Sequence, residues 1–224
     1  MSSPLSAPIR IALIHALRHS IQPIEQSFAR LWPEARLANL LDDSLSTDLA
    51  QAGELTPAMT ERFLTLARYA KACGADAILF TCSAFGPCIE ACAQALAPMP
   101  VLKPNEAMIE EAVAQAGPAG RIGLLATFAP TLASMPAEFA AAAPRALLVP
   151  ALASEALVAL DRGDAAAHDR LAAEKARVLE SCDVVALAQF SLSSAAPLVA
   201  EVTSRPVLTT PDSAVRKLQR LLAA

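Results

Sequence analysis

The chain has 224 residues, of which 54% are hydrophobic, so it can bury a sizeable core in one large α/β domain or in two small ones. Its formal net charge of −4, from 18 Lys and Arg against 22 Asp and Glu, provides no basic surface that would hold nucleic acid. Much of the apolar content is alanine, and no stretch approaches the roughly 18 consecutive apolar residues of a membrane span, so no membrane partner is expected.

The N-terminal segment MSSPLSAPIR lacks the features of a secretion signal, because the apolar run Ile11–Ile14 that follows it is only four residues long. Five cysteines are an odd number, and a chain of this size needs no disulfide staples, so we expect reduced thiols. Both features predict a cytoplasmic protein.

Short apolar runs alternate with longer segments of helical periodicity, which is typical of parallel sheets flanked by helices. The expected strands are Ile11–Ile14, Arg36–Leu40, Ala77–Thr81, Val101–Leu102, Ile122–Ala126, Ala146–Val149, Val184–Ala188 and Val207–Leu208. The sequence therefore predicts an α/β fold.

Three of the expected helices have clear boundary signals. The first begins at the capping residue Thr56 and ends before Gly74. A second covers Asp164–Ser181, with His168 expected at an exposed position, and a third opens at Asp212. These helices lie between expected strands, as a parallel sheet requires.

The second half of the chain repeats landmarks of the first half in the same order. Three pairs recur, at offsets of 111, 107 and 106 residues: Arg10 and Arg121, Asp76 and Asp183, Pro100 and Pro206. This repeat predicts two pseudosymmetric βα lobes, residues 1–116 and 117–224, each a three-layer αβα unit with a parallel sheet. We expect the active site beyond the carboxyl ends of the strands, in the cleft between the lobes.

Residues that directly follow four of the expected strands are therefore the candidates for a site. They are His15, Arg18, His19 and Ser20; Cys82, Ser83 and Ala84; Thr127 and Phe128; and Gln189, Phe190 and Ser191. Cys82 is the candidate nucleophile or acid/base, because backbone N–H groups at the start of the next helix are expected to lower the pKa of its thiol. The alternative is a buried cysteine that acts as a small apolar residue.

The segment ADAILFTCSAFGP, residues 75–87, resembles the first cysteine motif of the aspartate/glutamate racemase superfamily, which includes hydantoin racemases, maleate isomerases and arylmalonate decarboxylases. GRIGLLAT (residues 120–127) is similar to the strand that opens the second half of that fold, and CDVVALAQFSLSSAAP (residues 182–197) to its second active-site motif. The resemblance implies catalysis without pyridoxal phosphate or metal. It also implies two cysteines, of which one removes and the other delivers the proton at the substrate's α-carbon.

The resemblance assigns expected roles to five of the candidates. Cys82 matches the first catalytic cysteine, Ser83 and Ala84 match the positions that hold a substrate carboxylate, and Thr127 with Phe128 matches a further substrate-contacting loop.

The second cysteine of that pattern is missing. Alignment of the aspartate landmarks places Gln189 at the position equivalent to Cys82, whereas counting back from the proline landmarks places Ala188 there. Ser191 is near, but a hydroxyl without an activating partner is too weak an acid or base to replace a thiol. His15 or His19 could receive an anionic substrate or act as the opposing acid, and the alternative for both is a solvated loop.

The first hypothesis is a cofactor-independent, racemase-type isomerase that moves a proton next to a carboxylate or carbonyl of a small substrate, with Cys82 as acid/base. Ser83, Thr127, Gln189 and Ser191 would donate hydrogen bonds to the substrate anion. The alternatives are a one-cysteine lyase or decarboxylase, a maleate-type cis–trans isomerase, and a binding protein without turnover. We expect a homodimer or larger homo-oligomer.

Cofactor and metal signals are weak. Cys88 and Cys92 lie four residues apart on an expected apolar helix without a nearby histidine, so packing is favoured over zinc binding. No glycine-rich turn joins a strand to a helix, and no nucleotide cofactor is expected.

Overall fold

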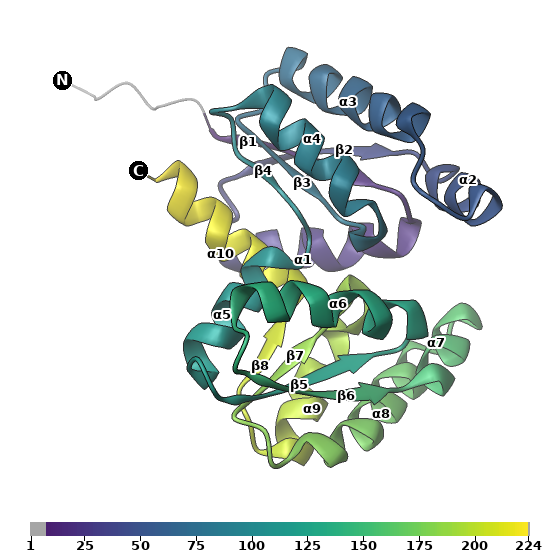
Figure 1. The fold of residues 1–224 in the computed structure, drawn as a ribbon, viewed down its shortest axis with the longest axis vertical. Coiled ribbons are helices and arrows are strands. Elements are labelled where there is room, and N and C mark those ends of the chain that lie inside the picture. Colours follow the sequence, from purple (N-terminus) through teal and green to yellow (C-terminus); the bar gives the residue numbers. More distant parts are fainter. Residues whose placement is uncertain (1–7, 224) are drawn as a thin grey trace. The chain divides into compact units, whose positions relative to one another are not determined.

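The computed structural model describes residues 8–223 and divides into two α/β units, each with one four-stranded parallel sheet (Figure 1). The first unit runs to Pro104 and resumes at Val215, and the second covers Asn105–Ala214. We refer to them as the first and second lobes and describe each by itself. The predicted fold class is confirmed.

The first lobe has the sheet order β2–β1–β3–β4, with every neighbouring pair parallel. Its strands are β1 (Arg10–His15), β2 (Arg36–Leu41), β3 (Ala77–Phe80) and β4 (Val101–Leu102). Its helices are α1 (Ile21–Leu31), α2 (Leu45–Ala52), α3 (Pro57–Ala72) and α4 (Gly86–Leu96), with the short 3₁₀ helices η1 (Arg18–Ser20) and η2 (Ser83–Phe85).

The second lobe repeats this order as β6–β5–β7–β8, again all parallel. Its strands are β5 (Arg121–Ala126), β6 (Leu147–Leu152), β7 (Val184–Leu187) and β8 (Val207–Thr209). The helices are α5 (Glu106–Ala116), α6 (Ala129–Ala142), α7 (Ser154–Asp161), α8 (Ala165–Ala176) and α9 (Ala196–Thr203), with η3 (Arg177–Leu179) and η4 (Phe190–Ala195). Helix α10 (Thr210–Leu222) begins here and ends in the first lobe.

All eight predicted strands are present, and most differ from the expected bounds by one residue. The largest difference is in β6, which continues through Pro150 to Leu152. Proline is tolerated there because β6 pairs only with β5 and forms the edge of its sheet, where a missing N–H breaks no ladder.

Alternation along the strands separates the two faces of the first sheet. Ala12, Ile14, Ile78 and Phe80 belong to one core cluster together with buried residues of α3 and α4. Their neighbours along the strands point to the opposite face, as the twofold period of a strand requires. Helix α1 lies at that opposite face, with Ile24 buried (Figure 1).

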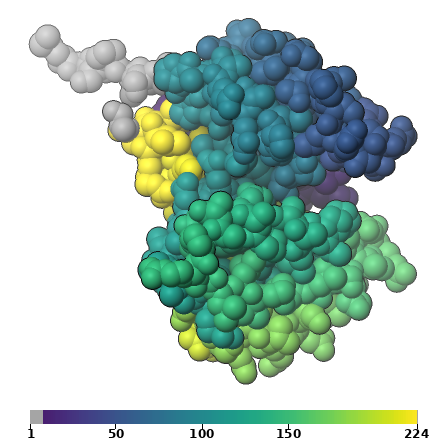
Figure 2. All heavy atoms as spheres, in the orientation of Figure 1, coloured from purple at the N-terminus to yellow at the C-terminus, as the bar shows by residue number. Residues whose placement is uncertain are grey.

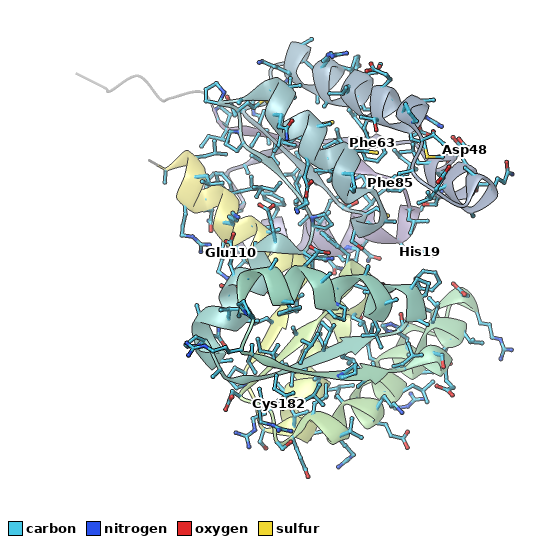
Figure 3. All side chains as sticks on the ribbon, in the orientation of Figure 1. His19, Asp48, Phe63, Phe85, Glu110 and Cys182 are labelled. Atoms are coloured by element: carbon cyan, nitrogen blue, oxygen red, sulfur yellow. The ribbon has the colours of Figure 1, made fainter. Side chains whose placement is uncertain are left out.

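Two contacts between phenylalanine rings, one stacked and one tilted, hold the turn that follows β3. The ring centroid of Phe63 on α3 lies 4.8 Å from that of Phe85 in η2, and both residues are labelled in Figure 3. It lies 5.2 Å from the ring centroid of Phe80. Phe85 is fully buried, so this contact anchors η2 and the residues just before it.

The second lobe shows the three predicted layers directly. Ile122, Leu124, Val184 and Ala186 form one cluster with residues of α5 and α6. Leu125, Val185 and Leu187 form the other cluster, with residues of α8 and α9. Each face of this sheet is therefore covered by its own pair of helices.

The boundary between the lobes differs from the expected one at residue 116. Met108, Ile109 and Ala112 of α5 pack with the second sheet, which places the boundary before this helix. The C-terminal end joins the first lobe, where Nε2 of Gln219 donates to the carbonyl oxygen of Leu31 over 2.8 Å. In Figure 2 this yellow end of the chain lies against the first lobe.

Side-chain caps explain where several helices begin. Thr56 accepts a hydrogen bond from the backbone N–H of Met59 at 3.2 Å, and Asp164 accepts from that of Ala167 at 2.9 Å, as expected for helix N-caps. The last helix begins at Thr210, two residues before the expected Asp212. No helix within residues 8–223 combines the length and apolarity needed to cross a membrane.

Candidate functional site

The internal repeat is built into both sheets by the same contact. The backbone N–H of Arg10 donates to Oδ2 of Asp76, and that of Arg121 donates to Oδ2 of Asp183, each over 2.7 Å. Each aspartate directly precedes the third strand of its lobe. These two aspartates are therefore equivalent positions, from which the sequences of the two lobes can be aligned.

Strand pairing decides which residue is equivalent to Cys82. Ile11 pairs with Ala77 in the first lobe, and Ile122 pairs with Val184 in the second. Five residues beyond each of these third-strand positions lie Cys82 and Gln189. Both have extended backbone and directly precede a 3₁₀ helix, so Gln189 and not Ala188 is the equivalent residue.

Cys82 lies half-buried at the carboxyl end of β3, and its side chain packs against the cluster formed with α3 and α4. Burial raises the pKa of the Cys82 thiol, and a hydrogen bond from the backbone N–H of Ala84 to the sulfur lowers it by less. The expected lowering of the pKa is therefore wrong. Helix α4 begins only at Gly86, after η2, and the field of a helix terminus falls off within about one turn.

His15 ends β1 and lies fully buried on the sheet face opposite Cys82. Its Nδ1 lies 2.8 Å from Oγ1 of Thr81, and its Nε2 lies 2.9 Å from Oδ1 of Asn39. Asn39 continues the chain by donating from Nδ2 to Oε1 of Glu25 over 2.7 Å. A line of four polar side chains thus runs from the exposed Glu25 to the residue before Cys82.

This line determines the tautomer of His15. Because Nδ2 of Asn39 donates to Glu25, its Oδ1 faces His15 and can only accept. Nε2 of His15 therefore carries the proton, and Nδ1 accepts from the hydroxyl of Thr81. Burial lowers the pKa of His15 and outweighs Asn39 and Glu25, which raise it. The lowered pKa favours the neutral form of the ring.

The structure thus assigns His15 a role that differs from the expected one. Both of its ring nitrogens are occupied within the first lobe, so neither faces a substrate anion. His19 remains exposed on η1, where Figure 3 labels it. We therefore interpret His15 as a residue that positions Thr81 and, through the backbone, Cys82.

Gln189 is held in a different way from Cys82. Its Oε1 accepts three hydrogen bonds, from the backbone N–H of Thr127 at 2.6 Å, from the hydroxyl of Thr127 at 3.1 Å, and from the backbone N–H of Phe128 at 3.3 Å. Thr127 is buried, whereas half of the Phe128 side-chain surface is exposed. These three predicted site residues are thus brought together at the strand ends of the second lobe.

The other predicted site residues lie beside these two strand ends. Ser83 is half-buried and Ala84 is exposed, both in η2. In η4, Ser191 is half-buried, but Phe190 is buried, so its ring is part of the packing of the lobe.

A charged cluster that the sequence did not predict lies at the end of β2. Arg62 on α3 donates from Nε to Asp42 over 2.7 Å and from Nη1 to Asp48 over 2.6 Å. Burial raises the pKa of Asp42, but hydrogen bonds from Ser44 and Arg62 outweigh it and hold the pKa below its ordinary value. The cluster fixes the loop after β2, and scattered single charges in the sequence gave no signal for it.

His168 was expected at an exposed position and is instead fully buried. Its Nδ1 lies 2.8 Å from Oδ1 of Asp169, which also accepts from the hydroxyl of Ser194 in η4. His168, Ala172 and Ala176 follow one another at intervals of four residues, and this helical spacing could have identified the inward position of His168.

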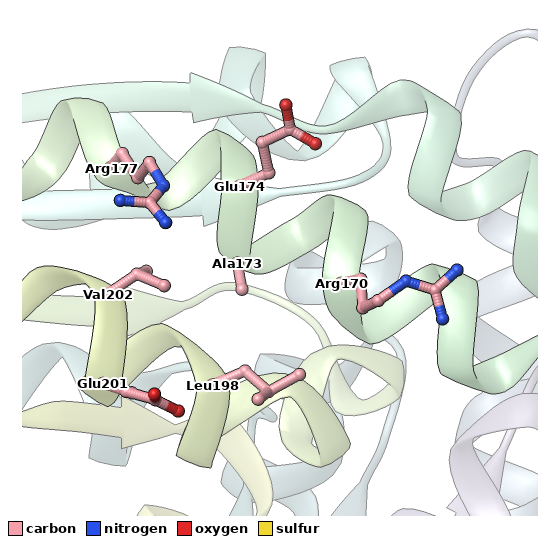
Figure 4. Close-up of a pocket in the computed structure, with 7 residues that line it drawn as sticks. All are labelled: Arg170, Ala173, Glu174, Arg177, Leu198, Glu201 and Val202. Atoms are coloured by element: carbon pink, nitrogen blue, oxygen red, sulfur yellow. The ribbon is translucent and has the colours of Figure 1, made fainter.

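The remaining cysteines and the surface grooves do not extend the site. Cys88 and Cys92 are fully buried in the first core, and no group of three or more His, Cys, Asp or Glu side chains in residues 8–223 could hold a metal ion. A groove of about 400 Å³ lies between α8 and α9, with Arg170 and Glu201 among its lining residues (Figure 4). None of the predicted site residues lines it.

Comparison with known proteins agrees with this fold. The family model of the Asp/Glu/Hydantoin racemases matches residues 20–218. The chain is similar to aspartate racemase from Picrophilus torridus (TM-score 0.71, 11% identity, covering 96% of this chain and 94% of that one) and to allantoin racemase from Klebsiella pneumoniae (0.68, 19%, 96% and 88%). It is also similar to unliganded arylmalonate decarboxylase (0.63, 16%, 95% and 92%). No match to a curated protein was found.

Proposed function

Because the chain belongs to the Asp/Glu/Hydantoin racemase family, we propose that it catalyses proton transfer at the carbon next to a carboxylate or carbonyl group of a small acid. Cys82 is the acid/base group, and no cofactor takes part. The observation that carries the proposal is the half-buried thiol at the carboxyl end of β3, whose sulfur accepts no hydrogen bond from any side chain within residues 8–223.

In the isomerase reaction, the thiolate of Cys82 takes the proton from the substrate carbon. The C–H bond breaks, an S–H bond forms, and the electron pair moves into the carbonyl or carboxylate to give an enediolate. Hydrogen bonds from Ser83, Gln189 and Ser191 to the substrate oxygens stabilise this anion. Thr127 supports it indirectly, because its backbone N–H and its hydroxyl both donate to Oε1 of Gln189. A proton from water then adds to the opposite face of the carbon, and the hydroxide that remains takes the proton from the thiol of Cys82, which restores the thiolate.

Two observations favour a second candidate, a lyase or decarboxylase that uses one thiol. Gln189 at the equivalent position has no ionisable group, and the raised pKa of Cys82 keeps its thiol in the acid form at neutral pH. In this reaction the bond to a departing carboxylate breaks, carbon dioxide leaves, and the electron pair forms an enediolate. Cys82 then protonates the carbon, and water returns a proton to the sulfur.

The residues of η2 support both reactions through the backbone. The N–H of Ala84 is directed at the sulfur of Cys82, where it stabilises the thiolate left after proton delivery. His15 contributes by fixing Thr81 from the opposite face of the sheet. A homodimer or larger homo-oligomer and a cytoplasmic location remain predictions.

The test is hydrogen exchange in deuterated water. The protein is incubated with a panel of amino acids, hydantoins and dicarboxylates, including malonate derivatives, and the α-position of each compound is analysed for deuterium. We expect incorporation or decarboxylation that Cys82→Ala lowers by about 10² to 10⁴-fold, which is the usual contribution of a general acid or base. Cys73→Ala is the matched control, because Cys73 is an exposed cysteine at the end of α3.

The chirality of the product separates the two reactions. Loss of optical purity in the recovered compound identifies a racemase, whereas a single labelled enantiomer or a decarboxylated product identifies one-sided proton delivery. Binding of a panel compound without exchange or decarboxylation would contradict both and leave a binding protein.

A further inference from the structure

The carboxamide of Gln189 has one orientation that satisfies its surroundings. Two backbone N–H groups and one hydroxyl converge on a single atom of the side chain, at 2.6 Å, 3.3 Å and 3.1 Å. Only the carbonyl oxygen of the amide can accept them, because the NH₂ group is a donor. Oε1 is therefore fixed toward Thr127 and Phe128, and Nε2 points away from them.

Nε2 of Gln189 is left with its two hydrogens. No residue within 8–223 accepts a hydrogen bond from them, although the side chain is half-buried at the end of β7. Nε2 is not one of the buried polar atoms without a partner, so it is open to solvent, and a donor that is held in a fixed direction is suited to meet an incoming acceptor.

We propose that Gln189 is a fixed hydrogen-bond donor to a carboxylate or carbonyl oxygen of the small acid, and that this lobe holds the ligand without exchanging a proton. The proposal rests on the proposed function and specifies what the position equivalent to Cys82 does. A neutral carboxamide neither takes up nor releases a proton near neutral pH, but it stabilises negative charge that develops on an oxygen. The ligand must offer an acceptor such as a carboxylate or carbonyl oxygen, because Nε2 has two hydrogens to donate and cannot accept.

A rival arrangement uses the same three donors differently. Gln189 would act as an internal plug that leaves when a ligand arrives, and the N–H groups of Thr127 and Phe128 would bind the ligand oxygen themselves. The two arrangements predict opposite effects of shortening the side chain. Removal of a donor weakens ligand binding, whereas removal of a plug strengthens it.

Side-chain amide NMR tests the donor directly in the unmodified protein. The Nε2 resonance of Gln189 is assigned as the glutamine signal missing from Gln189→Ala, and malonate, aspartate and phenylacetate are titrated separately. We expect at least one acid to shift this resonance. No shift with any of the three overturns the proposal.

Affinity measurements with the acid that gives the largest shift then separate donor from plug. We expect Gln189→Ala to weaken binding by about tenfold to a hundredfold, the range of one hydrogen bond to a charged acceptor. Gln189→Glu keeps an oxygen for the three donors but adds a negative charge, so it should weaken binding further. Tighter binding by Gln189→Ala contradicts the proposal and supports the plug.

Gln219→Ala is the control, because the amide of Gln219 donates to the backbone of Leu31 in the first lobe and should leave affinity unchanged. Exchange assays on the same samples separate this proposal from the proposed function. Cys82-dependent exchange with an unchanged KM in Gln189→Ala overturns only the donor role. A shifted Gln189 resonance without any exchange or decarboxylation overturns only the proposed catalysis.

Discussion

The strand ends of the two lobes are built on one plan but connect their side chains differently. In the first lobe His15 reaches across to Thr81, one residue before the thiol. In the second lobe Thr127 reaches across to Gln189, the residue equivalent to the thiol. The first contact therefore leaves the sulfur of Cys82 outside the side-chain network, whereas the second ties its counterpart down.

The difference comes from a shift of one residue along the first strand of each lobe. By the strand pairing, His15 is equivalent to Ala126, and Ala16 is equivalent to Thr127. Successive residues point to opposite sheet faces, so a polar side chain at the His15 position lies on the face away from Cys82. One at the Thr127 position lies on the same face as Gln189. The position of the polar residue, one place earlier or later on the first strand, thus decides whether it bonds to the residue at the end of the third strand or leaves that residue free.

The largest expected effect is on the reactivity of the Cys82 thiol, which no side chain ties down. Because burial raises the pKa of Cys82 above its ordinary value of 9.0, its alkylation by iodoacetamide should rise about tenfold per pH unit from pH 7 to 9. Mass spectrometry of tryptic peptides measures the rate for each cysteine. Cys88, which is fully buried, is the internal reference. A Cys82 rate that levels off near pH 7, or that stays below that of Cys88, contradicts this environment.

Removal of the His15 bridge should destabilise the first lobe. His15→Leu leaves the hydroxyl of Thr81 and the amide of Asn39 without their partner, and a buried unpaired group costs about 1–3 kcal/mol. Urea unfolding measures the loss in the free energy of unfolding. His19→Leu, at an exposed position, is the control and should change it little. Equal losses in both variants would show that the bridge contributes nothing.

The same bridge should make stability depend on pH. Burial lowers the pKa of His15 below its ordinary value of 6.5, so the unfolded chain binds the proton more readily than the folded one. The contribution is therefore fully present above about pH 6.5 and is lost as the pH falls through the folded pKa, with a slope of at most about 1.4 kcal/mol per pH unit. Unfolding free energies of the wild type and His15→Leu between pH 8 and 5 measure it, and parallel curves would contradict it.

The smallest expected effect belongs to the Thr127 bridge. Thr127→Val removes one of three donors to Gln189 while both backbone N–H groups remain, so unfolding should cost about 0.5–1.5 kcal/mol less. Thr203→Val, which removes a buried hydroxyl bonded to Val199 on α9, is the matched control for stability. Only Thr127→Val should broaden or shift the Gln189 amide resonance.

Much of the fold was predictable because it follows from local patterns. Apolar runs located all eight strands, and the aspartate landmarks identified the repeat, since each aspartate accepts a hydrogen bond from the start of its neighbouring strand. Cys82 and Gln189 were predicted as site residues because chemistry in parallel sheets lies at the strand ends, and the structure places both at that position. The roles of individual side chains were harder, because His15 looks like a loop residue until its partners on β2 and β3 are known.

The sequence by itself determined the α/β class, the two-lobe repeat and the list of strand-end residues, because each depends on periodicity and order along the chain. Only the tertiary structure decided the raised pKa of Cys82, the burial of His15 and His168, and the orientation of the Gln189 amide. These properties depend on desolvation and on hydrogen bonds between residues more than 20 positions apart or on the buried face of a helix. Such contacts are set by how the strands and helices pack, and a linear pattern does not contain them.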